Sequence, residues 1–389
     1  MYKVYANNNV IHNPFRSDEN LVLVDPVLQE SLNAHGSFEF KIAPNHPYYY
    51  SIEPRKTKIK IVSDALNNKP WFGRVISIQR GWDNLLSVYC EGELSSFCDS
   101  TFMPFGFKGS PLSLLTRLIN NYNGSQTDGF SYSIGNVSVT DPNDYIVRSS
   151  NAAQSVWEAL KNNLFGSSLG GYIFTRYDFS TDTHYIDYLS LDANDQYAKT
   201  STQEIQFGKN LLNFVQSWDA SGIITVLIPF GKAFSEADPE YEAGPPENGD
   251  WNGNRLTIAS VNNNRKYVQN SQGIAMYGRI VGTKTWDDVS VAANLKTKST
   301  QWLADQIWQS VMLELTAVDL SAVDVDIDQI QVGEYVRCKS KPHDLNVLLL
   351  CTQKTTYLTQ LEESSIILGA GQKTITDLQA QSQMKEANN

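Results

Sequence analysis

Several groups of residues have types and spacings that could do chemistry, and a row of aspartates is the first. Asp324, Asp326 and Asp328 alternate as the first ligands of a calcium-binding loop do. However, Gln329 and Tyr335 stand where such a loop needs glycine and glutamate. We therefore expect no calcium site here.

The stretch from Gly166 to Gly171 is rich in glycine, as phosphate-binding loops are. Tyr172 occupies the position of the lysine that such a loop uses to bind phosphate. The end of a helix followed by the start of a strand explains the same glycines. We expect no phosphate or nucleotide cofactor at this loop.

The histidines and cysteines form no recognisable catalytic or metal-binding motif. The five histidines lack HxH and HExxH spacing, and the four cysteines lack CxxC spacing. A cysteine hydrolase needs an activated thiolate beside a histidine, and no local pattern provides one. We predict no catalytic residue, metal site, cofactor or disulfide. The residues concerned are His12, His35, His46, His184, His343, Cys90, Cys98, Cys338 and Cys351.

Aromatic residues offer one further kind of site. Tyr48, Tyr49 and Tyr50, together with the eight tryptophans, could line a carbohydrate-binding groove. In β-rich chains the same residues also serve as core and interface packing. Both interpretations stay open.

Length and composition limit the class of protein. The chain has 389 residues, of which 41% are hydrophobic, enough for two to four domains with packed cores. No apolar run approaches the roughly 20 residues that span a bilayer, and no signal peptide begins the sequence, so we expect synthesis in the cytoplasm and no membrane segment. The net charge of −11 argues against specific nucleic-acid binding.

Residues 1–100 are predicted to form a small β-barrel or sandwich. Short apolar runs recur there, separated by turn-forming clusters. The runs at 56–62 and 72–78 flank a polar turn and predict a hairpin. The other runs are 21–24, 38–42 and 85–91.

Residues 101–204 are predicted to form an α/β domain. Ser110 and Pro111 are typical of a helix start, and Gly124 of its end. A second helix is expected at 152–165. A hairpin of strands 170–177 and 184–189 follows it.

The chain is organised around residues 205–232, which are predicted to form a strand, a turn and a second strand. The apolar run Ile223–Ile228 is rich in β-branched residues, so it predicts a strand buried on both faces. Pro229 is expected to end this strand, because proline cannot donate to a ladder. We expect the segment to complete the first β-barrel.

Residues 233–373 are predicted to form a second β-barrel domain with a helix at 292–308. The domain begins with an acidic loop at 233–254. Residues 374–389 are polar and predict a helical tail or a linker. The expected fold class is therefore α+β and β-rich, with two small β-barrel domains and one α/β domain. Leu295, Trp302, Leu303 and Ile307 share one face of the helix, and the later β runs are 311–320, 329–338, 347–357 and 364–368.

Three segments of the sequence carry a family resemblance: RKTKIKIV with WFGRV, the stretch from the Gly-Gly hairpin to SWDASGIITVLIPFGK, and IQVGEYVRCKS with SSIILGAG. They resemble segments of the tail-associated lysin, or endopeptidase tail, family of siphophage and prophage tail proteins. They occur in the family order, and Arg74 is expected to be a structural or subunit-contact residue. The positions that match the family motifs are Phe72, Gly73, Arg74, Gly170, Gly171, Gly208, Asn210, Pro229, Gly231, Gly333 and Gly369.

The resemblance implies the phage tail hub fold, which is similar to the central hubs of contractile tails, and assembly as a homotrimer at the virion tail tip. The implied partners are the distal tail protein, the tape measure protein, and receptor-binding proteins or a C-terminal fibre. No counterpart of the hydrolase domain of longer members follows Lys373, so we do not transfer the enzymatic activity. The chain is expected to be either a complete hub or the first part of a longer protein. A cell-wall hydrolase and a carbohydrate-binding adhesin stay as alternatives.

Overall fold

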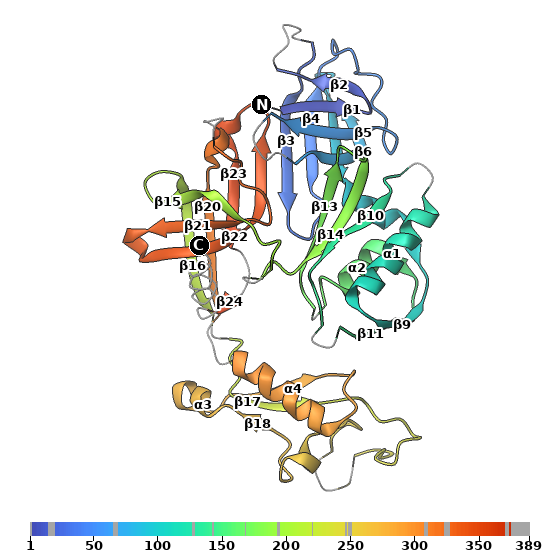
Figure 1. Cartoon of the computed structure of the whole chain (residues 1–389), viewed down its shortest axis with the longest axis vertical. Helices are drawn as coiled ribbons and strands as arrows, with labels where there is room; N and C mark the ends of the chain where they lie inside the picture. Colours follow the sequence, from blue (N-terminus) through green and yellow to red (C-terminus); the bar gives the residue numbers. More distant parts are fainter. Residues whose placement is uncertain are drawn as a thin grey trace. The chain divides into compact units, whose positions relative to one another are not determined.

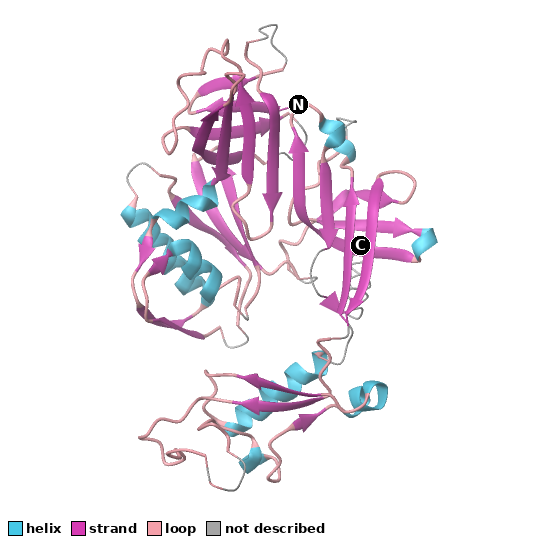
Figure 2. Ribbon diagram, turned by 180° about the vertical axis from the view of Figure 1, so that it is seen from behind, coloured by secondary structure: helices cyan, strands magenta, loops and turns pink. Residues whose placement is uncertain are grey.

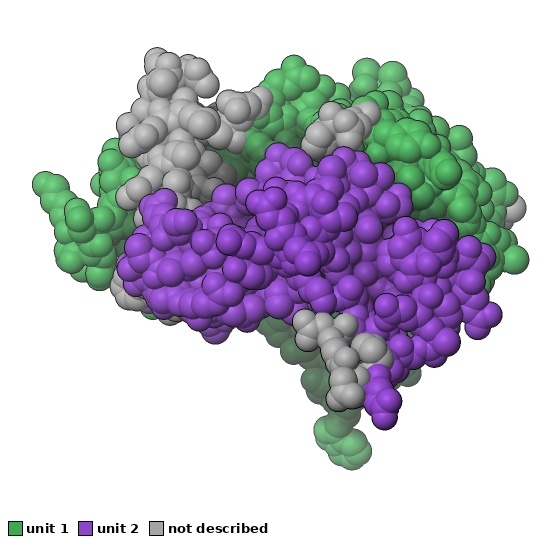
Figure 3. Space-filling view, turned by 90° about the horizontal axis from the view of Figure 1, so that it is seen from below, with its two compact units in different colours: residues 1–215, 313–370, 381–389 green, residues 216–312, 371–380 purple. Residues whose placement is uncertain are grey.

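β-Strands hold more residues than helices in the structure, a computed structural model whose elements appear in Figure 1 and Figure 2. It describes residues 2–14, 20–64, 69–126, 129–141, 144–167, 169–192, 195–219, 221–245, 247, 251–306, 310–322, 327–369 and 373–374. The chain forms two compact units (Figure 3). Unit 1 holds the described residues of 1–215 and 313–370, and unit 2 holds those of 216–312 and 371–380. The main segment of unit 2 therefore lies between two segments of unit 1 in the sequence.

The first β region of unit 1, residues 2–92, pairs its strands in the order β3-β4-β7-β6-β5-β1-β2. Buried and less buried residues alternate along β7, because successive side chains point to opposite faces. Phe38, Ile59 and Val88 lie in the core. Antiparallel pairing of β5 with β6 confirms the predicted hairpin. The strands are β1 (Tyr2–Ala6), β2 (Asn9–His12), β3 (Val24–Ser31), β4 (Ser37–Ile42), β5 (Lys58–Ser63), β6 (Trp71–Arg80) and β7 (Leu86–Gly92).

The α/β region, residues 93–192, holds the two helices predicted for it. Ser110 Oγ accepts a hydrogen bond from Ser113 N at 3.2 Å, which confirms the predicted cap of α1. α2 begins at Val156 rather than 152, because Ser155 and Glu158 form a capping box. The predicted hairpin is present as β13 and β14. The elements are η1 (Glu93–Asp99), β8 (Thr101–Phe102), β9 (Phe105–Gly109), α1 (Pro111–Ser125), β10 (Tyr132–Val137), β11 (Ile146–Ser150), β12 (Gln154–Ser155), α2 (Val156–Asn163), β13 (Tyr172–Asp178) and β14 (Thr183–Leu189).

The second β region is built from strands on both sides of the insertion. β15 lies parallel to β21, and the order continues through β22, β23 and β20 to β16. Residues 345–350 of the long strand β22 pair with β21, whereas residues 353–357 pair with β3. The two β regions thus form one continuous path of paired strands. The elements are β15 (Thr200–Gln206), β16 (Leu211–Asp219), β20 (Ser310–Ala317), η3 (Leu320–Ala322), β21 (Tyr335–Ser340), η4 (Lys341–His343), β22 (Leu345–Tyr357), η5 (Leu361–Glu363), β23 (Ser365–Gly369) and β24 (Lys373–Thr374).

In unit 2, the strand β17 lies between β18 and β19. It is parallel to β19, and the core beside it includes Leu227, Leu295 and Leu303. The predicted helix at 292–308 is confirmed as α4 up to Asp305. The elements are β17 (Val226–Phe230), η2 (Ala259–Val261), β18 (Val268–Gln269), α3 (Ser271–Tyr277), β19 (Val281–Thr285) and α4 (Ala292–Asp305).

The strand pairing differs from two predictions about residues 205–232. The segment does not complete the first β region, because β15 and β16 pair with β21 and β20, and β17 pairs within unit 2. Pro229 does not end its strand but lies inside β17. β18 pairs only with Val226 and Leu227, so the ladder on that side has ended before Pro229 and loses no bond there.

The predicted domain at 233–373 is also divided differently, since its part up to 312 lies in unit 2 and its described residues from 313 to 369 lie in unit 1. The predicted α+β, β-rich class is confirmed. Ile307, Asp324, Asp326 and the expected tail from residue 375 lie outside the described residues. No helix in the described part of the chain is long and apolar enough to cross a membrane.

Gly73 lies where two strands and a tryptophan ring leave no room for a side chain. It pairs with Gly92 across β6 and β7. A Cβ atom at Gly73 would collide with the ring of Trp71 and with the backbone oxygen of Glu91. Because a backbone atom cannot move aside cheaply, this position requires glycine.

We expect Gly73→Ala to lower the free energy of unfolding of unit 1 by about 1–3 kcal/mol through overpacking. Gly106→Ala is the matched control, because nothing lies within 4 Å of the Cβ it would add on β9. Urea unfolding followed by far-UV circular dichroism measures both variants. Equal midpoints for the two would contradict the close packing described at Gly73.

Candidate functional site

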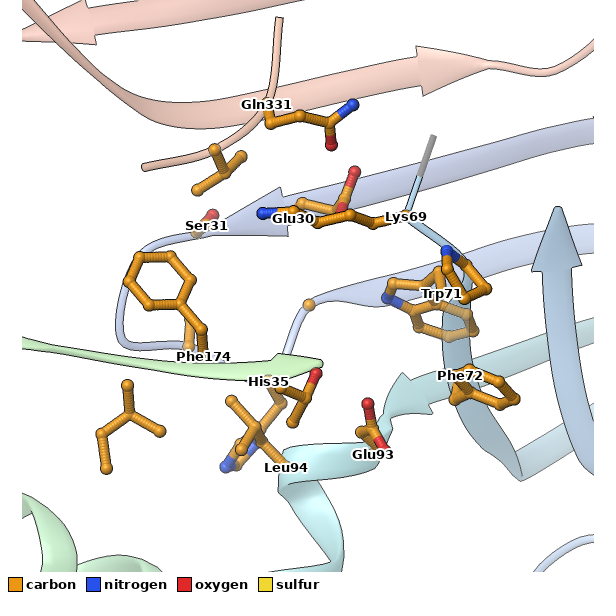
Figure 4. Close-up of a pocket in the computed structure, with 16 residues that line it drawn as sticks. Glu30, Ser31, His35, Lys69, Trp71, Phe72, Glu93, Leu94, Phe174 and Gln331 are labelled. Atoms are coloured by element: carbon orange, nitrogen blue, oxygen red, sulfur yellow. The ribbon is translucent and has the colours of Figure 1, made fainter. Parts of the chain in front are cut away.

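A cavity of about 110 Å³ lies where the three regions of unit 1 meet (Figure 4). The first β region contributes Glu30 and Trp71, the α/β region contributes Glu93 and Phe174, and the second β region contributes Gln331. A second cavity of about 140 Å³ shares Phe174 and continues toward β14 and the turn before β21. The 110 Å³ cavity is therefore lined by both aromatic rings and carboxylates, and carboxylates can act as acids or bases in catalysis.

The two carboxylates that line the cavity, Glu30 and Glu93, lie near basic side chains. Burial raises the pKa of Glu30, and the ammonium groups of Lys354 and Lys69 oppose that rise. Glu93 is buried, and its Oε2 lies 2.7 Å from Nδ1 of His184. The two atoms are close without being aligned for a hydrogen bond, so we describe the contact as an ion pair that forms when His184 is protonated.

The His184 ring is enclosed by aromatic side chains. Ring centroids of Phe72, Tyr177 and Phe130 lie 4.7, 4.8 and 5.2 Å from that of His184. This enclosure gives the family-motif residue Phe72 a packing role between β6 and the hairpin β13–β14. The Glu93–His184 pair is consequently part of the core rather than an open site.

The fold brings together one cysteine and one histidine that sequence reasoning did not connect. Cys98 Sγ lies 3.8 Å from His35 Nε2, although the two residues are 63 positions apart. The His35 ring packs on Trp157 with centroids 4.3 Å apart. The distance is that of a nucleophile and a base, so the surroundings must decide whether the thiol is activated.

The surroundings of Cys98 disfavour a thiolate. Although the residue is exposed, partial desolvation and the carboxylates of Glu91 and Asp99 raise the pKa of its thiol. Burial lowers the pKa of His35, so the imidazole is neutral near pH 7. Reactive cysteines lie in electropositive surroundings with a depressed pKa. Cys98 and His35 are therefore as close as the two residues of a catalytic dyad, but the charges around Cys98 disfavour the thiolate that such a dyad needs.

Arg74, the family-motif residue nearest to this pair, is itself engaged. It forms an ion pair with Asp99, and Arg55 donates to the same carboxylate at 2.9 Å. Burial acts to raise the pKa of Asp99, but the two arginines outweigh it and lower that pKa. Arg74 thus joins β6 to the last turn of η1.

Several family-motif glycines lie where an added side chain would collide with a neighbouring residue. Gly171 has φ of 86°, and a Cβ there would lie 2.5 Å from Val139 Cγ2. Gly333 has φ of 90°, and a Cβ there would lie 2.7 Å from the ring of Phe174. These residues are spread over unit 1 and do not form one site. Gly170, Gly208 and Gly369 also have positive φ, and Gly231 packs in unit 2 against Val289 and Leu256.

Asn210 is the family-motif residue with the most specific hydrogen bonds. Its buried side chain accepts from Gln206 N at 2.9 Å and donates to Glu204 O at 3.2 Å. Its backbone oxygen accepts from Val318 N. Asn210 thereby fixes the turn between β15 and β16 and ties it to the end of β20.

A buried ion pair between Lys354 and Asp319 lies at the centre of the second β region, and sequence reasoning missed it. The Lys354 Nζ donates to Asp319 Oδ2 at 3.0 Å and to Ile330 O at 2.7 Å. Asp319 also accepts from Gln203 Nε2 at 2.7 Å and from Ile330 N at 3.0 Å. Every charged atom is therefore matched, as a buried pair requires.

Burial alone would raise the pKa of Asp319, but Lys354 and the hydrogen-bond donors outweigh burial and lower it. Burial alone would lower the pKa of Lys354, but Asp319 outweighs burial and raises it. Both groups are charged near neutral pH. Among the described residues, no group of three or more histidine, cysteine or acidic side chains is placed to hold a metal ion.

Comparisons with known proteins show a similarity to prophage tail proteins. Residues 198–379 match the family model described as prophage endopeptidase tail. The predicted family resemblance is confirmed. A search of curated proteins gave no match.

Three solved structures have a similar fold over almost the whole chain. Prophage tail protein gp18 from Listeria monocytogenes EGD-e has a TM-score of 0.52 and 12% identity, covering 100% of this chain and 99% of that one. The 43 kDa tail protein of prophage MuSo2 from Shewanella oneidensis has a TM-score of 0.55 and 12% identity, covering 95% and 98%. The tail protein from Neisseria meningitidis MC58 has a TM-score of 0.54 and 12% identity, covering 95% of each chain. The chain therefore has the fold of prophage tail proteins.

Removing one partner of the buried pair should be costly, because the other charge stays buried. We expect Lys354→Met to lower the free energy of unfolding by about 3–5 kcal/mol. The double variant Lys354→Met/Asp319→Asn should lose less than Lys354→Met alone, since no uncompensated charge is left. Urea unfolding of the two variants and the wild type measures this order, and an additive loss in the double variant would contradict it.

The same pair predicts a pH dependence with a definite sign. Asp319 has a folded-state pKa below its ordinary value of about 3.9, so its contribution is present above that pH and is lost as the pH falls through the folded pKa. In Lys354→Met the buried carboxylate lacks its cation and its pKa should rise. The free energy of unfolding of this variant should therefore increase relative to that of the wild type as the pH falls from 7 to about 5. Parallel pH profiles for the two proteins would contradict this prediction.

Alkylation can test whether Cys98 is activated. The other three cysteines are buried, so Cys98 should react first with iodoacetamide in the native protein. We expect the reaction rate to rise with a midpoint above about 8.5, the value of a free thiol. His35→Ala should change the rate at neutral pH by less than about twofold, since a neutral imidazole does not stabilise the thiolate. A midpoint below pH 7 that is lost in His35→Ala would instead identify an activated dyad.

Proposed function

We propose that this chain is a structural hub of a phage or prophage tail tip. Three copies form a ring that caps or closes the tail tube below the distal tail protein. The observation that carries the proposal is the match of the whole chain, 95–100% of its length, to two prophage tail proteins and a third tail protein that are themselves covered to 95–99%. A common fold over the full length favours a common architectural role.

The interior of unit 1 supports a role as a scaffold. Its cavity carboxylates lie near cationic groups or a histidine, Glu30 within the influence of Lys354 and Lys69 and Glu93 beside His184, and Cys98 lies beside carboxylates that oppose thiolate formation. A hydrolase would instead need a positioned nucleophile with an adjacent base and donors for the developing charge. In this proposal the chain binds two neighbouring proteins, the distal tail protein and the tape measure protein. Receptor-binding proteins or a fibre are further partners.

A carbohydrate-binding adhesin is the second candidate, because two aromatic side chains are displayed together on the first β region. Tyr50 and Trp82 are 84% and 103% exposed. Tyr49 OH donates to Asn84 O at 2.7 Å, so the loop of Tyr50 and the turn of Trp82 are held side by side. Exposed aromatic rings are suited to stack on sugars or on a protein partner. Binding of glycans that is lost in Trp82→Ala would favour the adhesin.

The hub proposal predicts the behaviour of the purified chain and of tails that lack it. Light scattering after size exclusion should give about three times the chain mass of 43.6 kDa. Deletion of the gene from the prophage that encodes it should leave no complete tails in electron micrographs, and a plasmid copy should restore them. Normal infectious tails in the deletion strain would overturn the proposal. Release of soluble fragments from host cell wall by the purified chain would favour a hydrolase.

A further inference from the structure

β16 differs from the other long strands of unit 1 because no residue from Leu211 to Gln216 is buried. Strands such as β7 bury every second residue. In β16, Leu212 and Val215 are 62% and 47% exposed although they project from opposite faces of the strand. Phe207, in the turn that leads into β16, is 55% exposed. Each face of the strand thus carries at least one exposed apolar side chain, Leu212 on one and Val215 on the other.

The backbone of β16 is also at the end of its sheet. Among the described strands, β20 is its only neighbour. The opposite end of the same path is protected, because His46 Nε2 contacts Ile11 O of β2 at 2.9 Å. The Asn13 N also donates to Leu21 O at 3.0 Å just beyond β2. The two ends of the path are therefore unlike, since Leu212 and Val215 are exposed at the β16 end whereas Ile11 is buried at the β2 end.

The sequence of β16 lacks the charges that normally protect such an edge. No charged residue occurs from Asn210 to Trp218, between Lys209 and Asp219. Edge strands in soluble proteins carry lysines, prolines or bulges that prevent pairing with other chains. An uncharged apolar edge is a template for strand addition. The strand β16 is nevertheless held against the rest of unit 1, since the ring of Phe214 stacks on that of His343 with centroids 4.5 Å apart.

We propose that the edge of β16, with Phe207, Leu212 and Val215, is the contact surface for a second copy of this chain. The inference rests on the proposed trimer and assigns the surface that forms it. A threefold ring has heterologous contacts, so β16 of one copy meets a different surface of the next copy. The unlike ends of the strand path suit such a head-to-tail arrangement.

The charge of the chain favours another copy over a foreign partner. Each copy carries a formal net charge of −11, so two copies have a net electrostatic repulsion. They approach at least cost where both surfaces are uncharged, which is the character of β16. A foreign partner would be guided by complementary charge, and β16 offers none.

The test places a charge at the contact and compares it with a matched position. Val215→Lys and Leu212→Lys should each raise the trimer dissociation constant at least about tenfold, because the new ammonium group would be buried or repelled. Val147→Lys is the control, since Val147 is 50% exposed on β11 and resembles Val215 in type and setting. Light scattering over a dilution series measures assembly, and thermal unfolding shows that the variants are folded. Assembly that is unchanged in both β16 variants, or weakened equally by the control, would overturn the inference and leave the hub proposal standing.

A photo-crosslinking residue at position 212 separates the possible occupants. Crosslinks between copies, from 212 to a surface other than β16, are expected. Crosslinks from 212 to 212 would reveal a twofold contact instead of a ring. Crosslinks within one chain would mean that another segment of the same chain covers β16. Either of the last two results, or a wild type that stays monomeric, would overturn the inference.

Discussion

The buried ion pair of Lys354 and Asp319 holds the point at which the two β regions of unit 1 share a strand. Lys354 lies in the half of β22 that pairs with both β23 and β3, just beyond the half that pairs with β21. A strand that changes partners along its length needs a fixed register. The ion pair supplies a fixed point for that register, since Lys354 also donates to Ile330 O and Asp319 also accepts from Gln203 of β15. The cavity lined by all three regions lies close to this junction, since Glu30 senses the charge of Lys354.

Local elements could be predicted from the sequence because their signals are local. Ser110 with Pro111 marks a helix start through a hydrogen bond that spans three residues, and the structure contains that bond. The β5–β6 hairpin likewise follows from two apolar runs and the turn between them. The partners of the apolar strand β17 could not be predicted in the same way. Any strand of the chain offers the same backbone groups, and only the complete fold decides which strands meet.

The same distinction, between local signals and contacts made only in the complete fold, applies to the candidate sites. Gly73 could be identified from a family motif, and the structure supplies the reason in a ring and a carbonyl that occupy the space of a side chain. Cys98 with His35, and Lys354 with Asp319, are separated by 63 and 35 residues. No spacing rule connects residues that meet only through tertiary packing. Even with the contact known, the chemistry of the Cys98–His35 pair depends on the carboxylates around it rather than on the two residues themselves.

The insertion of unit 2 has a consequence for how such a chain can change over time. The chain passes from unit 1 to unit 2 within β16 and returns within β20, and these two strands are neighbours in the sheet. A segment whose entry and exit are adjacent can be lengthened, exchanged or lost while the strand order around it stays the same. Recombination can therefore replace the segment between these two strands while the strand order of unit 1 is kept.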